Sequence, residues 1–349
     1  METFWYVMVT LMLAVYVVLD GFDFGVGILY PFATRTEIER RTALASIGPV
    51  WNGNEVWLIA SGGLLFFAFP RAYAAGFSGF YLALILVLWL LIFRGLALEL
   101  RGHLDYDLWR QFWDLAFAGA SLLLAIVFGA ALGNLIRGVP LNPEGYFFVA
   151  FWTTFTPGAE PGILDWYTVL MGLTSAAILA MHGANYLAMK TEGQLSRRAD
   201  SLGRLAGCLA VGLTVLAVLA IPFVRPGLMH NYADHPIGYL LPIAGGLALG
   251  GVLYLRAEGR EVGAFFASSL FILAMLGSVA WGVYPNLLIA TTDPANSLTA
   301  FNAAAGPDGL RLGLIWFPVG ISLVIVYQVY VHRAFWGKVR LDSEPNPAE

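Results

Sequence analysis

Long apolar stretches dominate this sequence and limit what the chain can fold into. A bilayer core about 30 Å thick is crossed by about 20 mostly apolar residues in an α-helix. Nine stretches meet that requirement, at about 4–30, 50–69, 72–98, 113–136, 162–189, 205–224, 237–255, 262–285 and 311–332. The chain is therefore predicted to be an all-α polytopic membrane protein with nine transmembrane helices.

The composition excludes the main soluble classes of protein. Of the 349 residues, 59% are hydrophobic and only 12% are charged, and the mean hydropathy is +0.73. Soluble domains carry about twice that share of charged residues. The net charge of −4 does not indicate a nucleic-acid partner, and the single cysteine, Cys208, excludes a disulfide framework or a cysteine-rich metal site.

The distribution of Lys and Arg predicts the orientation, because these residues concentrate on the cytoplasmic side of a membrane. Fifteen of the 19 lie in or beside the odd-numbered connections and the C-terminal tail: Arg35, Arg40, Arg41, Arg94, Arg101, Arg110, Lys190, Arg197, Arg198, Arg204, Arg256, Arg260, Arg333, Lys338 and Arg340. The even-numbered connections hold only Arg71, Arg137, Arg225 and Arg311. The N-terminus is therefore expected outside and the C-terminus in the cytoplasm.

Ionisable side chains occur inside the predicted spans, where each needs a partner or a task. The residues concerned are Asp20, Asp23, Glu55, Arg94, Glu99, Arg101 and His182, with the polar Asn52 three residues before Glu55. At a rise of 1.5 Å per residue, Asp20, Asp23, Glu55, Arg94, Glu99 and His182 all fall in the predicted cytoplasmic half. Gly21 and Gly25 form a small-xxx-small pair that lets a second helix approach closely.

Three interpretations of these groups compete. In the first, the acids pair with Arg94 and Arg101 and hold the first three spans together. In the second, they line a path for protons, since burial and neighbouring charges move carboxylate and imidazole pKa values toward neutrality. In the third, they form the cation site of a secondary transporter. His182, the one histidine well inside a span, is more typical of a hydrogen-bonded core residue than of a haem ligand.

Several motifs together resemble subunit II of the cytochrome bd-type quinol oxidases. They occur in the family's order at Gly21–Gly27 (GFDFGVG), Trp51–Trp57 (WNGNEVW), Phe69–Tyr81, Phe93–Arg94, Gly133–Asn134 with Gly138–Pro140, His182–Leu187 and Lys190–Gly193. The resemblance extends from about residue 15 to about residue 335.

The resemblance implies a respiratory complex of a bacterial or archaeal plasma membrane that oxidises quinol and reduces O2 to water, contributing to a proton gradient. A haem-bearing subunit I would hold two b-type haems, one d-type haem and the quinol site. This chain would ligate no haem or metal and bind no nucleic acid, and would line a proton path. A small single-span accessory subunit, lipid and quinone are further expected partners.

The resemblance also assigns roles to residues. Asp20 matches a family carboxylate and is the leading proton-path residue, whereas Asp23 also matches and is expected to be a structural partner of Arg94. Asn52 stands where the family often has an acid on the proton route. Two outcomes are open: Glu55, one turn later on the same face, replaces that acid, or the route enters elsewhere. The predicted structural cluster is Asp23, Arg94, Glu99, Arg101 and His182.

The resemblance further implies two four-helix bundles plus one peripheral helix, within a single membrane domain over residues 1–341. The bundles would occupy about 1–136 and 162–285, the last helix about 311–335, and a polar tail 342–349. The alternatives are a purely structural assembly subunit and a secondary transporter that acts alone.

Overall fold

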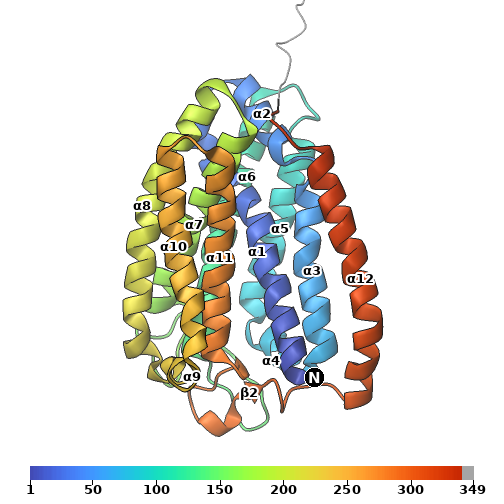
Figure 1. Ribbon diagram of the computed structural model, residues 1–349, viewed down its shortest axis with the longest axis vertical. Helices are drawn as coiled ribbons and strands as arrows, with labels where there is room; N and C mark the ends of the chain where they lie inside the picture. The colour runs from blue at the N-terminus through green and yellow to red at the C-terminus, as the bar shows by residue number, and fades with distance from the viewer. Residues whose placement is uncertain (340–349) are drawn as a thin grey trace, which may run out of the picture.

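The structure, a computed structural model, describes residues 1–339 (Figure 1). The predicted polar tail at 342–349 lies outside these residues. The helices are α1 (Glu2–Ala33), α2 (Glu37–Ile47), α3 (Trp51–Ala68), α4 (Pro70–Gly79), α5 (Tyr81–Leu100), α6 (Asp107–Arg137), α7 (Trp166–Lys190), α8 (Gly193–Val224), α9 (His230–Asp234), α10 (Leu240–Ala257), α11 (Glu261–Val283) and α12 (Pro307–Ala334). Two short antiparallel strands, β1 (Asn286–Leu288) and β2 (Leu298–Thr299), complete the described elements together with 3-10 turns.

Eight helices within residues 1–339 are long and apolar enough to cross a membrane: α1, α5, α6, α7, α8, α10, α11 and α12. The expected multi-pass membrane protein is therefore confirmed at this level. The second predicted span forms α3, but this helix is not among the eight, because Asn52, Asn54 and Glu55 lower its hydropathy. A ninth crossing over α3 stays a prediction.

Two predicted boundaries differ from the structure. The stretch 72–98, predicted as one span, is divided into α4 and α5 at Phe80, which has non-helical dihedral angles and caps both helices. The helix predicted from 205 begins twelve residues earlier, at Gly193, with a polar first part that extends beyond the apolar stretch. Hydropathy marks the apolar length of a chain segment, and it detects neither a backbone break inside an apolar stretch nor a polar extension of a helix.

Helix α1 occupies the middle of the molecule and packs against α3, α6, α7 and α11 (Figure 1). Helix α8 packs on α7, and α10 packs on α11. Helix α12 lies at one edge, where its buried residues are Leu310, Gly313 and Phe317. The division into two four-helix bundles and a peripheral helix stays a prediction.

The connections predicted to be cytoplasmic gather at one end of the helices, which we call the α2 end (Figure 1). There Arg101 Nη1 lies 2.8 Å from Glu37 Oε1, and Lys338 Nζ lies 2.8 Å from Glu261 Oε2. The opposite end, here the β end, contains the strands and the N-terminus. Its two long loops bind each other, since Thr291 N donates to Val139 O at 2.9 Å.

The backbones of α1 and α7 touch at two glycines, which is the close approach that Gly21 and Gly25 predicted. A Cβ atom at Gly25 would lie 2.0 Å from the Leu179 carbonyl oxygen and 2.6 Å from Gly183 N. A Cβ atom at Gly183 would in turn lie 2.3 Å from the Gly25 carbonyl carbon. No side chain fits at either position without moving a helix.

We expect Gly25→Ala to lower the stability of the full-length protein in mild detergent, by more than the 1–3 kcal/mol typical of overpacking, because it separates α1 from α7. Thermal unfolding is the measurement. The control is Gly62→Ala on α3, where an added Cβ meets nothing within 4 Å. Equal melting temperatures for the two variants would contradict the assigned contact.

Candidate functional site

A buried polar centre lies where α1, α3, α5 and α12 meet. We call it the inner polar cluster and define it as Asp20, Asp23, Asn54, Arg94 and Gln328. The side chains of Asp20, Asp23, Asn54 and Arg94 are at most 1% exposed. Buried charges in such surroundings persist only when they are paired or hydrogen bonded. The contacts within the cluster therefore decide what it can do.

Asp20 and Arg94 form a bidentate ion pair between α1 and α5. Arg94 Nη1 donates to Asp20 Oδ2 at 2.8 Å, and Nη2 donates to Oδ1 at 2.5 Å. The guanidinium carbon also lies 4.5 Å from the centre of the Phe24 ring. The expectation that Asp23 is the partner of Arg94 is thus wrong. Two residues three apart on a helix point about 60° apart, and only Asp20 faces α5.

Asp23 instead faces α3 and α12 through two amides. Asn54 Nδ2 donates to Asp23 Oδ2 at 2.9 Å and to Leu19 O at 3.2 Å, and Gln328 Nε2 donates to Asn54 Oδ1 at 2.8 Å. The second carboxylate oxygen, Asp23 Oδ1, is buried without a hydrogen-bond partner among residues 1–339. Asp23 is therefore the less fully satisfied of the two buried carboxylates.

The two polar residues predicted on α3 lie outside this cluster. Asn52 is exposed and Glu55 is half-buried, on a face where Val56 and Ile59 are also exposed, at 45% and 73%. Asn54, which the sequence analysis did not select, is the buried member. It begins the buried series Asn54, Trp57, Ser61, Leu64 and Ala68, whose spacing of three and four residues is the signal that identifies it.

The remaining predicted residues of the structural cluster are dispersed. His182 is buried on α7, with Nδ1 2.7 Å from Ser268 Oγ and Nε2 3.0 Å from Val18 O, and its ring stacks on Phe265. Glu99 is exposed, so its inclusion in the cluster is wrong. Its position near the last turn of α5 turns the carboxylate away from the other helices.

Arg101 belongs to a separate network at the α2 end. It donates to Glu37 at 2.8 and 2.9 Å and to Asp114 Oδ1 at 2.5 Å, and Tyr30 also donates to Asp114. These bonds attach α2 to α5 and α6. The hydrogen bond from Arg101 lowers the pKa of Glu37, and the positive charge of Arg101 acts in the same direction.

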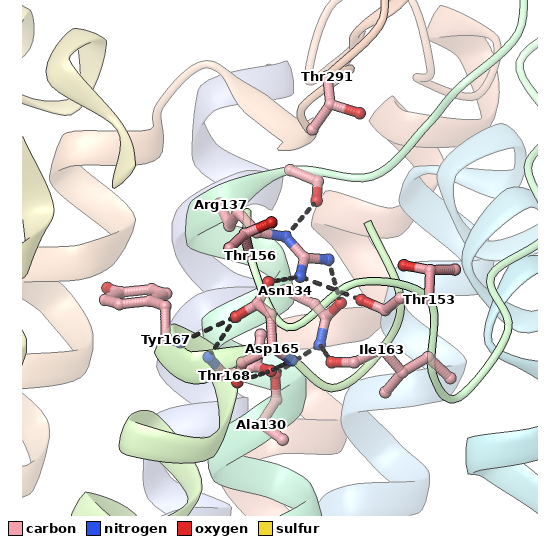
Figure 2. Close-up of polar contacts among 12 residues, drawn as sticks. Ala130, Asn134, Arg137, Thr153, Thr156, Ile163, Asp165, Tyr167, Thr168 and Thr291 are labelled. Carbon is pink, nitrogen blue, oxygen red and sulfur yellow. Dashed lines mark hydrogen bonds and ion pairs between the residues drawn. The ribbon is translucent and has the colours of Figure 1, made fainter. Parts of the chain in front are cut away.

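A second fully buried ion pair lies at the β end and was not selected by the sequence analysis. Figure 2 shows the guanidinium of Arg137, at the end of α6, between Asp165 and Asn134. Arg137 Nη1 donates to Asp165 Oδ2 and, at 3.1 Å, to Gly162 O, and Nη2 donates to Asn134 Oδ1 at 2.6 Å.

The partners of Arg137 are themselves fully bonded. Asp165 caps α7, because its Oδ1 accepts from Tyr167 N and Thr168 N, both at 2.9 Å (Figure 2). Asn134 Nδ2 donates to Ala130 O at 2.8 Å and Ile163 O at 3.0 Å. A network with every polar atom engaged rigidifies the loop between α6 and α7 and offers no free group for chemistry.

Two substitutions at Asp165 separate its two roles. We expect Asp165→Asn to retain the cap but lose the ion pair, and Asp165→Ala to lose both. Both variants should be strongly destabilised, because Arg137 is left as an uncompensated buried charge. The free energy of unfolding of Asp165→Ala should be about 1 kcal/mol lower than that of Asp165→Asn. Thermal unfolding of the full-length protein in detergent measures both, and equal stability of the two variants would contradict the capping role.

The Glu37 contact predicts a pH-dependent stability. A carboxyl group whose pKa is lowered on folding stabilises the folded state above its unfolded pKa, and this is lost as pH falls through the folded pKa. The ordinary value for Glu37 is 4.5. At pH 7 we expect the wild-type protein to have a higher melting temperature than Glu37→Gln. The difference in melting temperature should vanish as the pH falls below 4.5 and through the lowered pKa of Glu37. Glu144→Gln, at an exposed site, is the control.

The comparisons with known proteins agree in one family. The family "cytochrome bd terminal oxidase subunit II" matches residues 1–335. The chain is 32% identical to the probable cytochrome oxidase subunit 2 of Haemophilus influenzae, covering 97% of this chain and 94% of that relative. It is 31% identical to the cytochrome bd-I ubiquinol oxidase subunit 2 of Escherichia coli K12, covering 98% and 96%.

The fold agrees as well. The bd oxidase from Geobacillus thermodenitrificans contains a chain that matches with a TM-score of 0.77 at 19% identity, over 96% of this chain and 98% of that one. These results confirm the expected family, and they agree with the expected location in a bacterial plasma membrane. This protein belongs to the family of subunit II of the cytochrome bd terminal oxidases, which are respiratory quinol oxidases.

Proposed function

We propose that this chain is the haem-free subunit of its oxidase and carries protons from the α2 end toward a haem-bearing subunit I. Reduction of O2 to water consumes one proton for each electron, so protons must reach the oxygen-reducing centre through the protein. The proposal deepens the family assignment. Quinol oxidation and the haems, two b-type and one d-type, would belong to subunit I.

The observation that carries the proposal is the set of carboxylates that continues from the interior to an open face. Asp20 and Asp23 are fully buried on α1, and Glu55 is half-buried on α3. The exposed Asn52, Val56 and Ile59 surround Glu55 on a face that a partner subunit would cover. Intramembrane ionisable groups are costly, and proton transfer is a task that requires them.

The hydrogen bonds of His182 support the absence of haem ligation. Both ring nitrogens bond within the chain, to Ser268 and to Val18, so neither is free to bind iron. Within residues 1–339, no group of three or more His, Cys, Asp and Glu side chains could hold a metal ion.

The orientation forms part of the same proposal. The α2 end contains most of the Lys and Arg residues of the connections and would face the cytoplasm. The β end, with the N-terminus, would lie outside. Protons would then enter from the cytoplasm, and their consumption would contribute to the gradient. A small single-span subunit, lipid and quinone remain proposed partners.

A purely structural role is the second candidate, and the Asp20–Arg94 pair favours it. A bidentate pair at 2.5 and 2.8 Å satisfies both charges and joins α1 to α5. Removal of one partner from such a pair costs about 3–5 kcal/mol. An Asp20 variant therefore has to be judged by turnover per assembled complex and not by yield.

We expect Glu55→Gln and Asp20→Asn to slow quinol oxidation tenfold or more per complex, with haem content unchanged, because an amide cannot ionise. Oxygen consumption normalised to haem d in the purified complex is the measurement. Glu99→Gln, at the exposed end of α5, is the matched control and should keep full turnover.

A rescue sharpens the test. If Glu55 replaces the acid that the family often has at position 52, Asn52→Asp should restore turnover to Glu55→Gln. The structural candidate predicts instead low yield with full turnover per complex. Full turnover of both Glu55→Gln and Asp20→Asn would overturn the proton path.

A further inference from the structure

A cavity of about 580 Å³ lies between α12 and the body of the protein, next to the inner polar cluster. Its walls come from α1, α2, α7, α11, α12 and the turn before α3, and it extends to the α2 end. Lining residues that matter here are Phe22, Ser46, Ser269, Gln328, His332 and Lys338. The described mechanism does not use this cavity.

Two hydrogen bonds link the cavity wall to Asp23, which does not itself line the cavity. Gln328 is part of the wall, and its amide donates to Asn54 Oδ1, while Asn54 donates to Asp23 Oδ2. Amide groups exchange protons too slowly to carry them, so their role is to hold the carboxylate. With Oδ2 held by Asn54, Asp23 Oδ1 remains as the oxygen that can accept a proton.

His332 is the one histidine among the lining residues of the cavity and lies one helical turn after Gln328. Its Nδ1 lies 3.0 Å from Gln328 O, and because a carbonyl only accepts, Nδ1 carries the hydrogen. The neutral ring then has its lone pair on Nε2, which is buried without a partner among the described residues. An imidazole in this state can accept a proton at Nε2 and release it again.

Hydrogen bonds of two lysines and of the main chain hold the rim of the cavity at the α2 end. Lys190 Nζ donates to Phe335 O at 2.6 Å, and Val339 N donates to Lys190 O at 2.8 Å. Lys338 Nζ bonds Thr191 O at 2.9 Å and Glu261 Oε2 at 2.8 Å. These bonds attach the segment after α12 to α7 and α11, so the position of the opening is fixed.

We infer that this cavity is the proton inlet of the chain, with His332 as the proton-exchanging group and Gln328 and Asn54 as positioning residues for Asp23. The inference rests on the proposed proton path and names its entrance. A proton passes from water in the cavity to His332 Nε2, giving the imidazolium. It then leaves through water to Asp23 Oδ1, which returns the ring to its neutral form.

Water access can be tested without measuring turnover. In the full complex carrying Cys208→Ser, we expect Ser269→Cys to react with a charged, membrane-impermeant methanethiosulfonate added from the α2 side. The matched control is Leu270→Cys. Leu270 is 52% exposed on the lateral face of α11, so a cysteine there should not react with this reagent. Reaction of Ser269→Cys with only a membrane-soluble maleimide means a cavity filled by lipid and overturns the inference.

The role of His332 is tested in the same complex. We expect His332→Ala to slow proton uptake at least fivefold and to raise the solvent isotope effect, with the haem spectrum and the KM for quinol unchanged. Added imidazole should restore the rate, which a merely structural defect would not allow. Gln328→Leu should slow uptake without imidazole rescue, and Arg333→Ala, at the exposed neighbouring position, should have no effect.

The outcomes separate the two proposals. Full turnover of His332→Ala overturns the inlet while leaving the Asp20 and Glu55 results to judge the path. Full turnover of the Asp20 and Glu55 variants overturns the path, and the labelling of Ser269→Cys still decides whether the cavity admits water.

Discussion

The buried ion pair between Asp20 and Arg94 is the constraint on which the centre of this protein depends. Neither charge has access to water, so each is tolerated only because the other neutralises it at 2.5–2.8 Å. The pair fixes α5 against α1. It also leaves Asp23, one turn further along, as a second carboxylate without a cation of its own.

That asymmetry distinguishes the two buried carboxylates of α1. Asp20 is satisfied by a bidentate partner, whereas Asp23 accepts at one oxygen from Asn54, which in turn accepts from Gln328. The amide chain comes from α3, which packs on α1, and from α12 at the edge of the protein (Figure 1). A carboxylate inside the bundle is thereby connected to a cavity that extends to the α2 end.

The two ends of the protein use buried arginines differently. At the α2 end, Arg101 bonds acids of α2 and α6 that remain partly exposed. At the β end, Arg137 and Asp165 are sealed within a completely bonded network that caps α7 (Figure 2). The membrane interior contains the only cluster within residues 1–339 in which a fully buried carboxylate oxygen has no partner.

The amino-acid sequence by itself determined the membrane class, the family, most of the spans and the close contact at Gly25, because hydropathy, charge and glycine spacing are local properties. It also selected Asp20, Asp23, Glu55 and Arg94 as groups inside the membrane. Only the tertiary structure decided which acid meets Arg94, that Glu99 lies outside the cluster, and that Asn54, Gln328 and Arg137 have buried partners. Pairing depends on which helix faces pack against each other. Residues as far apart in the sequence as Asn54 and Gln328 leave no local sequence signal of their contact.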